Sequence, residues 1–262
     1  MLLVSDVHGE FASLGALARS GETLLILGDL INLLDYRTRE GIIADVLGQE
    51  FGGRVADHRA SGDYEGMRRA WTEMVGSRRD EVRAAIDVRI RQEYELCRLA
   101  LEPAKGYATY GNVDRPELLA AALPPGMPLL DGEVVDIEGV TFGFVGGGIA
   151  TPVGAAGEVT DEEMVAKLEM IGEVEILCSH LPPALAPLAT DVITGRQERS
   201  SRPILDYLNR YRPRFHFYGD VHQPQASTWR LGSTVARNVG YFRATKRPVA
   251  LDITNGVPHL RG

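Results

Sequence analysis

The chain has 262 residues, of which 44% are hydrophobic, and a net charge of −8 at pH 7. This is enough apolar material for a full core, and the acidic balance argues against a general nucleic-acid binder. No apolar run approaches 18 residues, and no basic segment leads into a long apolar run, so we expect neither a transmembrane helix nor a signal peptide. The two distant cysteines, Cys97 and Cys178, fit a reducing compartment. We therefore expect a soluble, cytoplasmic protein with no membrane partner.

Residues 1–35 have the pattern of a strand, a helix and a second strand. Residues 1–4 form an apolar run, and Leu14, Leu17 and Ala18 are spaced as one apolar face of a helix. The run TLLIL at 23–27 is typical of a buried strand.

Residues 36–105 interrupt this alternation with 13 basic and 13 acidic residues and predict two or three helices. Apolar stripes at helical spacing lie within residues 42–47, 64–74 and 79–101. We interpret this segment as a helical insertion within a single domain of residues 1–262. The stripes predict packing against one another or against the main sheet. The alternatives are that they cover the active site or form a homodimer.

The α/β alternation resumes at Tyr107. Strands are predicted at residues 107–110, 133–137, 140–145, 175–178, 214–218, 226–231, 234–239 and 247–253. Helices are predicted at residues 116–122, 161–171 and 203–211. The three glycines at 146–148 indicate a turn or a close backbone approach and lack the spacing of a nucleotide-binding loop.

Five short polar blocks, each directly after an apolar run, are the most informative feature of the chain. They are Asp6-Val7-His8, Gly28-Asp29-Leu30, Gly111-Asn112-Val113-Asp114, Ser179-His180 and Gly219-Asp220-Val221-His222. Because parallel strands end at one edge of their sheet, side chains from distant blocks can converge there. Three carboxylates, three imidazoles and an asparagine amide are the ligands expected of a two-metal hydrolytic centre.

Plainer interpretations exist for the single residues. Asp and Asn are common turn residues after strands, and Asp114 is expected to cap the helix that begins near Pro116. His216 alternates within a strand and is expected to be a packed residue. A nucleophilic triad through Ser179 and His180 is rejected, because neighbouring residues on an extended chain point in opposite directions.

The order D-x-H, G-D, G-N-x-D, H and G-x-x-H resembles the calcineurin-like metallophosphoesterase superfamily from residue 1 to about residue 240, interrupted by the insertion. The resemblance implies a four-layer α/β/β/α sandwich of two mixed β-sheets flanked by helices. It implies a first metal ion held by Asp6, His8, Asp29 and His222. It implies a second metal ion held by Asp29, Asn112, His180 and Asp220. Asp29, Asn112 and His180 are the residues expected to be catalytic.

Two positions depart from the family pattern. Val113 stands where most members have a histidine that contacts the phosphate and helps to protonate the leaving group, a role worth about 10²–10⁴-fold in rate. Asp220 stands where the family usually has a histidine, and a carboxylate there favours Mn²⁺ or Fe²⁺, with Zn²⁺ or Mg²⁺ as alternatives. We expect Asn112 and Arg115 to bind the phosphate, a surface position being the alternative for Arg115. His58 is an alternative source of the acid.

The resemblance implies a metal-dependent phosphoesterase, and we expect a phosphodiesterase that hydrolyses a small phosphate ester by attack of a metal-bridging hydroxide. The alternative is a protein-binding scaffold on the same fold with weakened or no catalysis, which Val113 and Asp220 favour. A cyclic-nucleotide phosphodiesterase or a nucleotide pyrophosphatase is a narrower version of the first hypothesis. The negative charge disfavours long nucleic acids as substrates.

Overall fold

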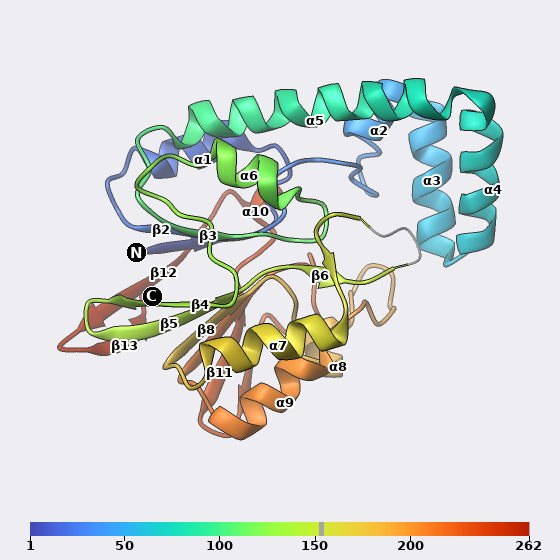
Figure 1. Ribbon diagram of the computed structural model, residues 1–262. Coiled ribbons are helices and arrows are strands. Elements are labelled where there is room, and N and C mark those ends of the chain that lie inside the picture. The colour runs from blue at the N-terminus through green and yellow to red at the C-terminus, as the bar shows by residue number, and fades with distance from the viewer. Residues whose placement is uncertain (152–154, 262) are drawn as a thin grey trace. The chain divides into compact units, whose positions relative to one another are not determined.

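The structure, a computed structural model, describes residues 1–151 and 155–261. Its residues cluster into two compact units, one made of Met1–Leu30 and Cys97–Gly262 and the other of Ile31–Leu96. The first unit contains both large sheets (Figure 1). It also contains all seven residues predicted to bind metal.

The first sheet has five strands and combines a parallel core with an antiparallel edge. In spatial order the strands are β13 (Val257–Leu260), β12 (Val249–Thr254), β1 (Leu2–Val4), β2 (Leu24–Leu27) and β3 (Gly106–Thr109). Strands β1, β2 and β3 run parallel, with Leu3 opposite Leu25 and Leu25 opposite Tyr107. The continuous apolar runs of β1 and β2 are buried throughout, as expected of strands covered on both faces.

The second sheet has six strands and is also mixed. Its strands, in spatial order, are β10 (Thr228–Leu231), β11 (Thr234–Asn238), β9 (Phe215–Tyr218), β8 (Ile176–Ser179), β5 (Val140–Val145) and β4 (Glu133–Ile137). The four inner strands are parallel, and β4 and β10 pair antiparallel at the two edges. A two-stranded ribbon joins β6 (Gly148–Ile149) to β7 (Glu158–Val159).

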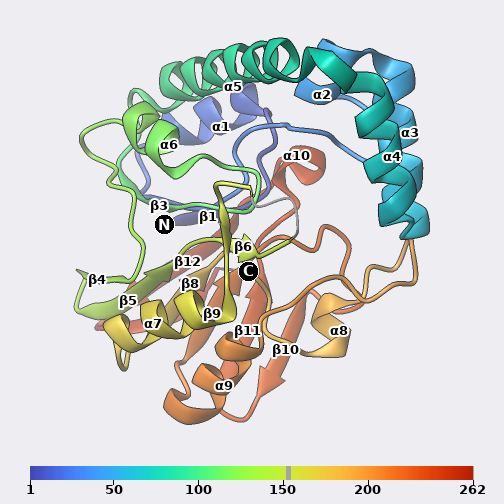
Figure 2. The same ribbon diagram turned by 45° about the vertical axis from the view of Figure 1, so that its right-hand side comes forward.

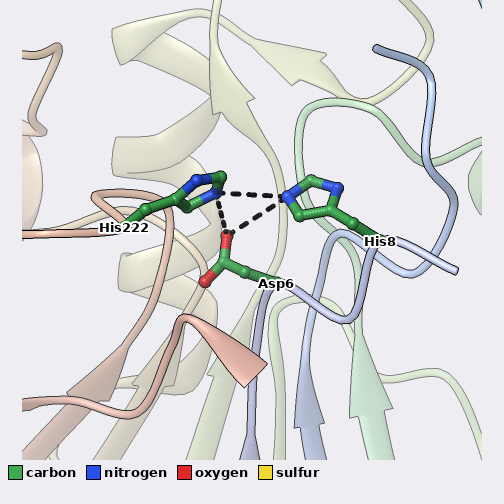
Figure 3. Close-up of side chains that lie close together, drawn as sticks. All are labelled: Asp6, His8 and His222. Carbon is green, nitrogen blue, oxygen red and sulfur yellow. Dashed lines mark hydrogen bonds and ion pairs between the residues drawn. The ribbon is translucent and has the colours of Figure 1, made fainter. Parts of the chain in front are cut away.

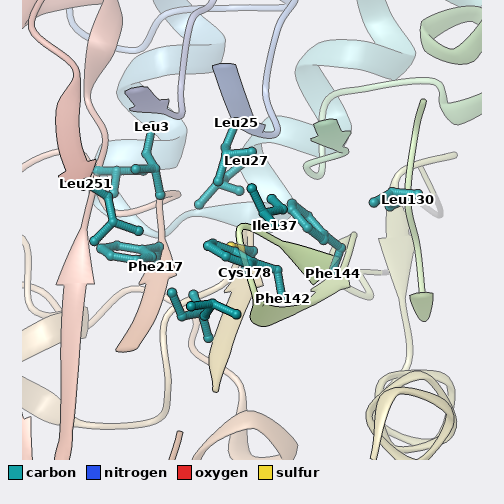
Figure 4. Close-up of a cluster of buried hydrophobic side chains, with 13 residues drawn as sticks. Leu3, Leu25, Leu27, Leu130, Ile137, Phe142, Phe144, Cys178, Phe217 and Leu251 are labelled. Atoms are coloured by element: carbon teal, nitrogen blue, oxygen red, sulfur yellow. The ribbon is translucent and has the colours of Figure 1, made fainter. Parts of the chain in front are cut away.

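The two sheets share one core. Side chains of the first sheet, among them Leu3, Leu25 and Leu251, are clustered with Phe142 and Phe217 of the second sheet, and all five are fully buried (Figure 4). Burying apolar surface between the two sheets is what stabilises this arrangement. The predicted sandwich of two mixed sheets flanked by helices is therefore confirmed.

Helices cover the outer face of each sheet in the first unit. The helices that lie wholly in this unit are α1 (Phe11–Ala18), α6 (Pro116–Ala122), α7 (Asp161–Ile171), α8 (Ala186–Ala189), α9 (Arg202–Tyr211) and α10 (Phe242–Thr245). Figures 1 and 2 both place α1 and α6 over the first sheet and α7 and α9 over the second sheet. Leu168 of α7 and Leu208 of α9 pack with Leu177 of β8. α7 begins with a reciprocal capping box between Thr160 and Glu163.

The second unit is helical, and residues 36–105 contain four helices where two or three were predicted. The helices of residues 36–105 are α2 (Ile42–Leu47), α3 (Gln49–Ser61), α4 (Tyr64–Val75) and α5 (Arg79–Leu101), with a 3₁₀ turn, Gly76–Arg78, before α5. The stripes of α2 and α4 pack together with α3, where Phe51 and Trp71 meet edge to face at 5.1 Å. Across the described residues, no helix combines the length and the apolarity that crossing a membrane requires.

Candidate metal centre

Each of the five polar blocks begins where a strand ends. The blocks follow β1, β2 and β3 of the first sheet and β8 and β9 of the second sheet, and within each sheet these strands are parallel. The loops that carry the blocks therefore meet at one edge of the sandwich, as the sequence predicted.

The loops take a backbone conformation that only a few residue types tolerate. Asp6, His8, Asp29 and Asp220 all have φ between 40° and 65°, in the left-handed region. Asp, Asn and His are enriched there, whereas β-branched residues are not, and strained backbone of this kind is concentrated at functional sites. The backbone at these four residues is therefore in a conformation of higher free energy, and their side chains converge at the site.

Two glycines allow the blocks to approach one another. A Cβ atom on Gly111 would collide with Asp29 Oδ1 and would lie 2.7 Å from His180 Nε2. A Cβ atom on Gly219 would collide with Ser5 Oγ and Asp6 Oδ2. Any side chain at either position would push the loops apart, which explains the glycine that begins these two blocks.

One cluster of metal-binding atoms comes from Asp6, His8 and His222 (Figure 3). Their ligand atoms all lie within 4.8 Å of one another. His222 Nε2 lies 3.4 Å from Asp6 Oδ1 and 3.2 Å from His8 Nε2, and His8 Nε2 lies 3.9 Å from Asp6 Oδ1. Two imidazole nitrogens and a carboxylate oxygen that face one another are a typical partial ligand set for a transition-metal ion.

A second cluster comes from Asp6, Asp29 and His180, again with ligand atoms within 4.8 Å of one another. His180 Nδ1 lies 2.8 Å from the carbonyl oxygen of Leu27. Because a carbonyl only accepts, Nδ1 carries a proton, and Nε2 is the nitrogen whose lone pair is available to a ligand whenever the ring is neutral. That Nε2 lies 3.5 Å from Asp29 Oδ1 and 3.2 Å from Asn112 Oδ1.

Asp29 belongs to the second cluster and also faces the first, with a different oxygen toward each side. Its Oδ2 lies 3.7 Å from His8 Nε2, and its Oδ1 lies 3.5 Å from His180 Nε2. Its Oδ1 also accepts a hydrogen bond from the Val113 N–H at 3.1 Å. A carboxylate in this position can contribute one oxygen to each of two neighbouring cations.

The electrostatics of the site favour a cation. Burial raises the pKa of Asp6, but the hydrogen bond and charge of His222 outweigh burial and hold that pKa below its ordinary value. Burial lowers the pKa of His180, but the charges of Asp29, Asp6 and Asp220 outweigh burial and place that pKa well above its ordinary value. Burial raises the pKa of Asp220 to about 6. The negative charges of Asp6, Asp29 and Asp220 lie close together and repel one another. A divalent cation bound among them would offset this repulsion.

Asp220, Arg115 and His58 were also predicted as site residues or alternatives, and none of them belongs to either cluster found among the described residues. Asp220 Oδ1 lies 3.7 Å from His180 Nε2. Arg115 is the N-cap residue of α6 and is half-buried. His58 Nδ1 lies 3.0 Å from Asp63 Oδ2. Metal binding by each of the seven residues, the catalytic roles of Asp29, Asn112 and His180, and phosphate binding by Asn112 and Arg115 all stay predictions.

The residues present fit metal ions. The two clusters offer buried or half-buried oxygen and nitrogen atoms that converge, from Asp6, Asp29, His8, His180 and His222. These two clusters could hold metal ions, and their mixed oxygen and nitrogen donors suit first-row divalent ions.

Comparisons with known proteins add little to this geometry. No protein-family profile matches the chain. No curated protein matches it in sequence. Among solved structures, the crystal structure of TT1561 of Thermus thermophilus resembles it with a TM-score of 0.48 and 13% sequence identity, over 92% of this chain and 89% of that chain.

The sequence predicted that Asp114 caps α6, and this prediction is wrong. The helix α6 begins after Arg115 without a side-chain capping bond. The Asp114 carboxylate instead accepts hydrogen bonds from the N–H groups of Asp29, Leu30 and Gly111. Asp114 therefore connects the loop after β2 to the loop after β3. In the sequence, the position of Asp114 inside a polar block is the feature that points to a role in the site.

The glycines at 146–148 make the close backbone approach that the sequence predicted. The Gly147 N–H donates to the carbonyl of Tyr110 at 2.8 Å. A Cβ atom on Gly148 would collide with Asn112 Cβ and lie 3.0 Å from Asn112 Cα. This turn therefore packs directly against the backbone that presents Asn112.

We predict that Gly148→Ala displaces Asn112 and lowers Mn²⁺ affinity by about 10–100-fold, the usual effect of disturbing the groups that support a metal ligand. Calorimetric titration with Mn²⁺ measures this. Gly126→Ala is the matched control, because its Cβ atom would meet nothing closer than 3.5 Å. Equal affinity of both variants would contradict the prediction.

His216 is the packed histidine that its strand position indicated. It is fully buried, and its Nε2 lies 2.7 Å from Ser179 Oγ, which donates to the carbonyl of Leu181. Since that hydroxyl already donates, His216 Nε2 carries the proton. Burial lowers the pKa of His216 to about 3.

The lowered pKa predicts acid sensitivity. Above pH 6.5 His216 is neutral in both the folded and unfolded chain, and as the pH falls below 6.5 only the unfolded chain gains the proton. Folding is therefore weakened by about 2 kcal/mol between pH 7 and pH 5 through this residue. The test is urea unfolding of the metal-free protein at pH 7 and at pH 5. Between these pH values the free energy of unfolding should fall by about 2 kcal/mol less in His216→Phe than in the wild type. The same pH dependence in both proteins would refute this.

Proposed function

We propose that the protein is a metallophosphoesterase that uses two divalent metal ions to hydrolyse a small phosphate ester. The observation that carries the proposal is the pair of clusters that share Asp6, with the two oxygens of Asp29 turned to opposite sides. The order of the five polar blocks, which resembles the calcineurin-like metallophosphoesterases, supports the same function.

Each half of the centre has its own set of residues. We assign Asp6, His8 and His222 to the first ion and Asn112 and His180 to the second. We assign Asp29 to both ions and Asp220 to the second, an assignment that the contact between Asp220 and His180 supports. Bound in this way, two divalent ions would activate water and offset the charge that develops on a phosphoryl group.

The chain's own groups prepare the site for this chemistry. The hydrogen bond from His180 Nδ1 to the Leu27 carbonyl fixes the ring and leaves Nε2 available. Asn112 adds a neutral oxygen, so that not every oxygen donor of the second set is a carboxylate. Arg115, three residues further on, is proposed to contact the phosphate.

The substrate class follows from Val113. An aliphatic side chain has no proton to give a leaving group, and loss of a general acid costs least when the leaving group is already stable as an anion. We therefore propose a phosphodiester or a phosphoanhydride with a good leaving group, rather than an alkyl monoester. The carboxylate-rich ligand set favours Mn²⁺ or Fe²⁺ over Zn²⁺.

The test is Mn²⁺-dependent hydrolysis of bis-p-nitrophenyl phosphate, compared with hydrolysis of glycerol 2-phosphate. We expect turnover of the diester, much slower turnover of the alkyl monoester, and loss of both in His180→Ala. His259→Ala is the matched control, because His259 lies exposed on β13. Turnover that persists in His180→Ala, or that does not require metal, would refute the proposed mechanism.

A further inference from the structure

The segment from Asn238 to Arg243 contains none of the proposed ligands, yet it lies against the first half of the centre. It begins at the last residue of β11 and runs into α10. Within the first unit, three independent kinds of contact connect it to the loops that carry Asp6, His8 and His222.

Backbone hydrogen bonds connect the segment to the loop after β1. The Phe242 N–H donates to the Ser5 carbonyl at 3.1 Å, and the Arg243 N–H donates to the Asp6 carbonyl at 3.0 Å. A Cβ atom on Gly240 would collide with Asp6 Oδ2, so the backbone at Gly240 packs directly against that carboxylate. The position of Asp6 is therefore set in part by residues more than 230 positions away.

The side chain of Arg243 fixes the next ligand. Its Nη1 donates to the carbonyl of His8 at 2.6 Å, a short, charge-assisted hydrogen bond. His8 has a φ of 40°, a conformation that a residue other than glycine rarely adopts without support. Arg243 thus holds the His8 backbone in the conformation that turns the imidazole toward Asp6 and His222.

The ring of Tyr241 fixes the third ligand. Tyr241 and His222 stack with their planes 4° apart and their centroids 4.0 Å apart, and Tyr241 is only 5% exposed. The edge of His8 meets the same tyrosine at 6.1 Å. Among the contacts of the described residues, His222 has no hydrogen bond to a backbone carbonyl like that of His180, so the stack, together with the contacts of its Nε2 with Asp6 and His8, sets its ring plane.

The same segment also supports the loop that carries His222. Asn238 Nδ2 donates to the carbonyl of Val221 at 2.9 Å, and Asn238 Oδ1 accepts from the Gly240 N–H at 2.8 Å. The second half of the centre is supported differently, since His180 is held by Leu27.

We propose that Tyr241 and Arg243 are positioning residues for one of the two metal ions, the one assigned to Asp6, His8 and His222; this rests on the proposed function. Groups that orient metal ligands typically change metal affinity by about 10–100-fold when they are removed. The effect should fall mainly on one ion, because the side chains of Tyr241 and Arg243 contact His222 and His8, which belong to the first cluster only.

The experiment is calorimetric titration of the chelator-treated full chain with Mn²⁺ alone, on the wild type, Tyr241→Leu and Tyr241→Phe. We expect two binding events in the wild type and in Tyr241→Phe, which keeps the stacked ring. In Tyr241→Leu one of the two should weaken by about 10–100-fold while the other stays within about 3-fold. Tyr211→Leu is the control, because Tyr211 makes its aromatic contact with Tyr207 in α9.

Arg243→Gln provides a second route if Tyr241→Leu does not fold. It removes the charged donor to His8 and should weaken the same ion. Two events of wild-type strength in both Tyr241→Leu and Arg243→Gln, or equal weakening of both events, would overturn the inference alone. A wild-type chain that binds no Mn²⁺ would overturn the proposed function and this inference together.

Discussion

Replacing Asp29 by asparagine is expected to lower Mn²⁺-dependent hydrolysis of bis-p-nitrophenyl phosphate by about 10²–10³-fold or more, the scale for losing one preorganised electrostatic group. The carboxylate lies between His8 and His180 with one oxygen toward each, and asparagine can offer only one oxygen and no charge. Steady-state kinetics at saturating Mn²⁺, together with metal content, measure the loss.

The substitution is chosen so that folding is preserved. Asparagine has the same shape as aspartate, and its amide oxygen can still accept the hydrogen bond of the Val113 N–H. Asp206→Asn is the matched control, because Asp206 pairs with Arg202 on the exposed face of α9. An Asp29→Asn protein with wild-type turnover would show that Asp29 does not serve the metal centre.

The second large effect concerns stability. Adding Mn²⁺ to metal-free protein is expected to raise the free energy of unfolding by about 4 kcal/mol for each site at a free concentration near 1,000 times its dissociation constant. The reason is that Asp6, Asp29 and Asp220 are packed together in the folded chain and are separated in the unfolded chain, so that the ions bind the folded state far better.

Urea unfolding with added Mn²⁺ and with a chelator measures this difference. In the double variant Asp29→Asn, His180→Ala the increment from the second site should fall below about 1 kcal/mol, since that site loses two donors, whereas Asp6, His8 and His222 still offer donors to the first ion. An equal increment in the wild type and in the double variant would place the stabilising ions elsewhere on the protein.

Several elements of the fold could be predicted because local sequence and packing agree there. The helix at 116–122 begins with Pro116 at its first turn, where a missing N–H costs nothing. The hairpin of β4 and β5 turns at Glu138 and Gly139, both with positive φ, as a tight hairpin turn requires. In both cases the residues that define the element lie next to one another in the chain.

The helix α3 was missed because packing overrides propensity. Gly52 and Gly53 lie inside it, and glycine normally weakens a helix interior. A Cβ atom on Gly52 would lie 2.9 Å from Ala44 Cβ, so this glycine is where α3 meets α2 closely. The short helices α8 and α10 and the strand β13 were also missed, since four residues carry too little periodicity to detect.

The candidate site shows the same division between local and non-local signals. Asp6, His8, Asp29, Asn112, His180 and His222 could be named because each lies in a short block behind an apolar run, and the structure brings these blocks together. Tyr241 and Arg243 could not, because their partners lie far away in the chain and an aromatic or an arginine after a strand has no distinctive pattern. Only the folded chain shows which backbone they support.

The measurement that tests the central claim most directly is the metal content of wild-type protein purified without chelator, determined by elemental analysis together with turnover of bis-p-nitrophenyl phosphate in added Mn²⁺. The account predicts about two transition-metal ions per chain and metal-dependent turnover, as expected for a two-metal hydrolase. No bound ion, and no turnover after Mn²⁺ is added, would contradict it and would leave a protein-binding scaffold as the better description of this fold.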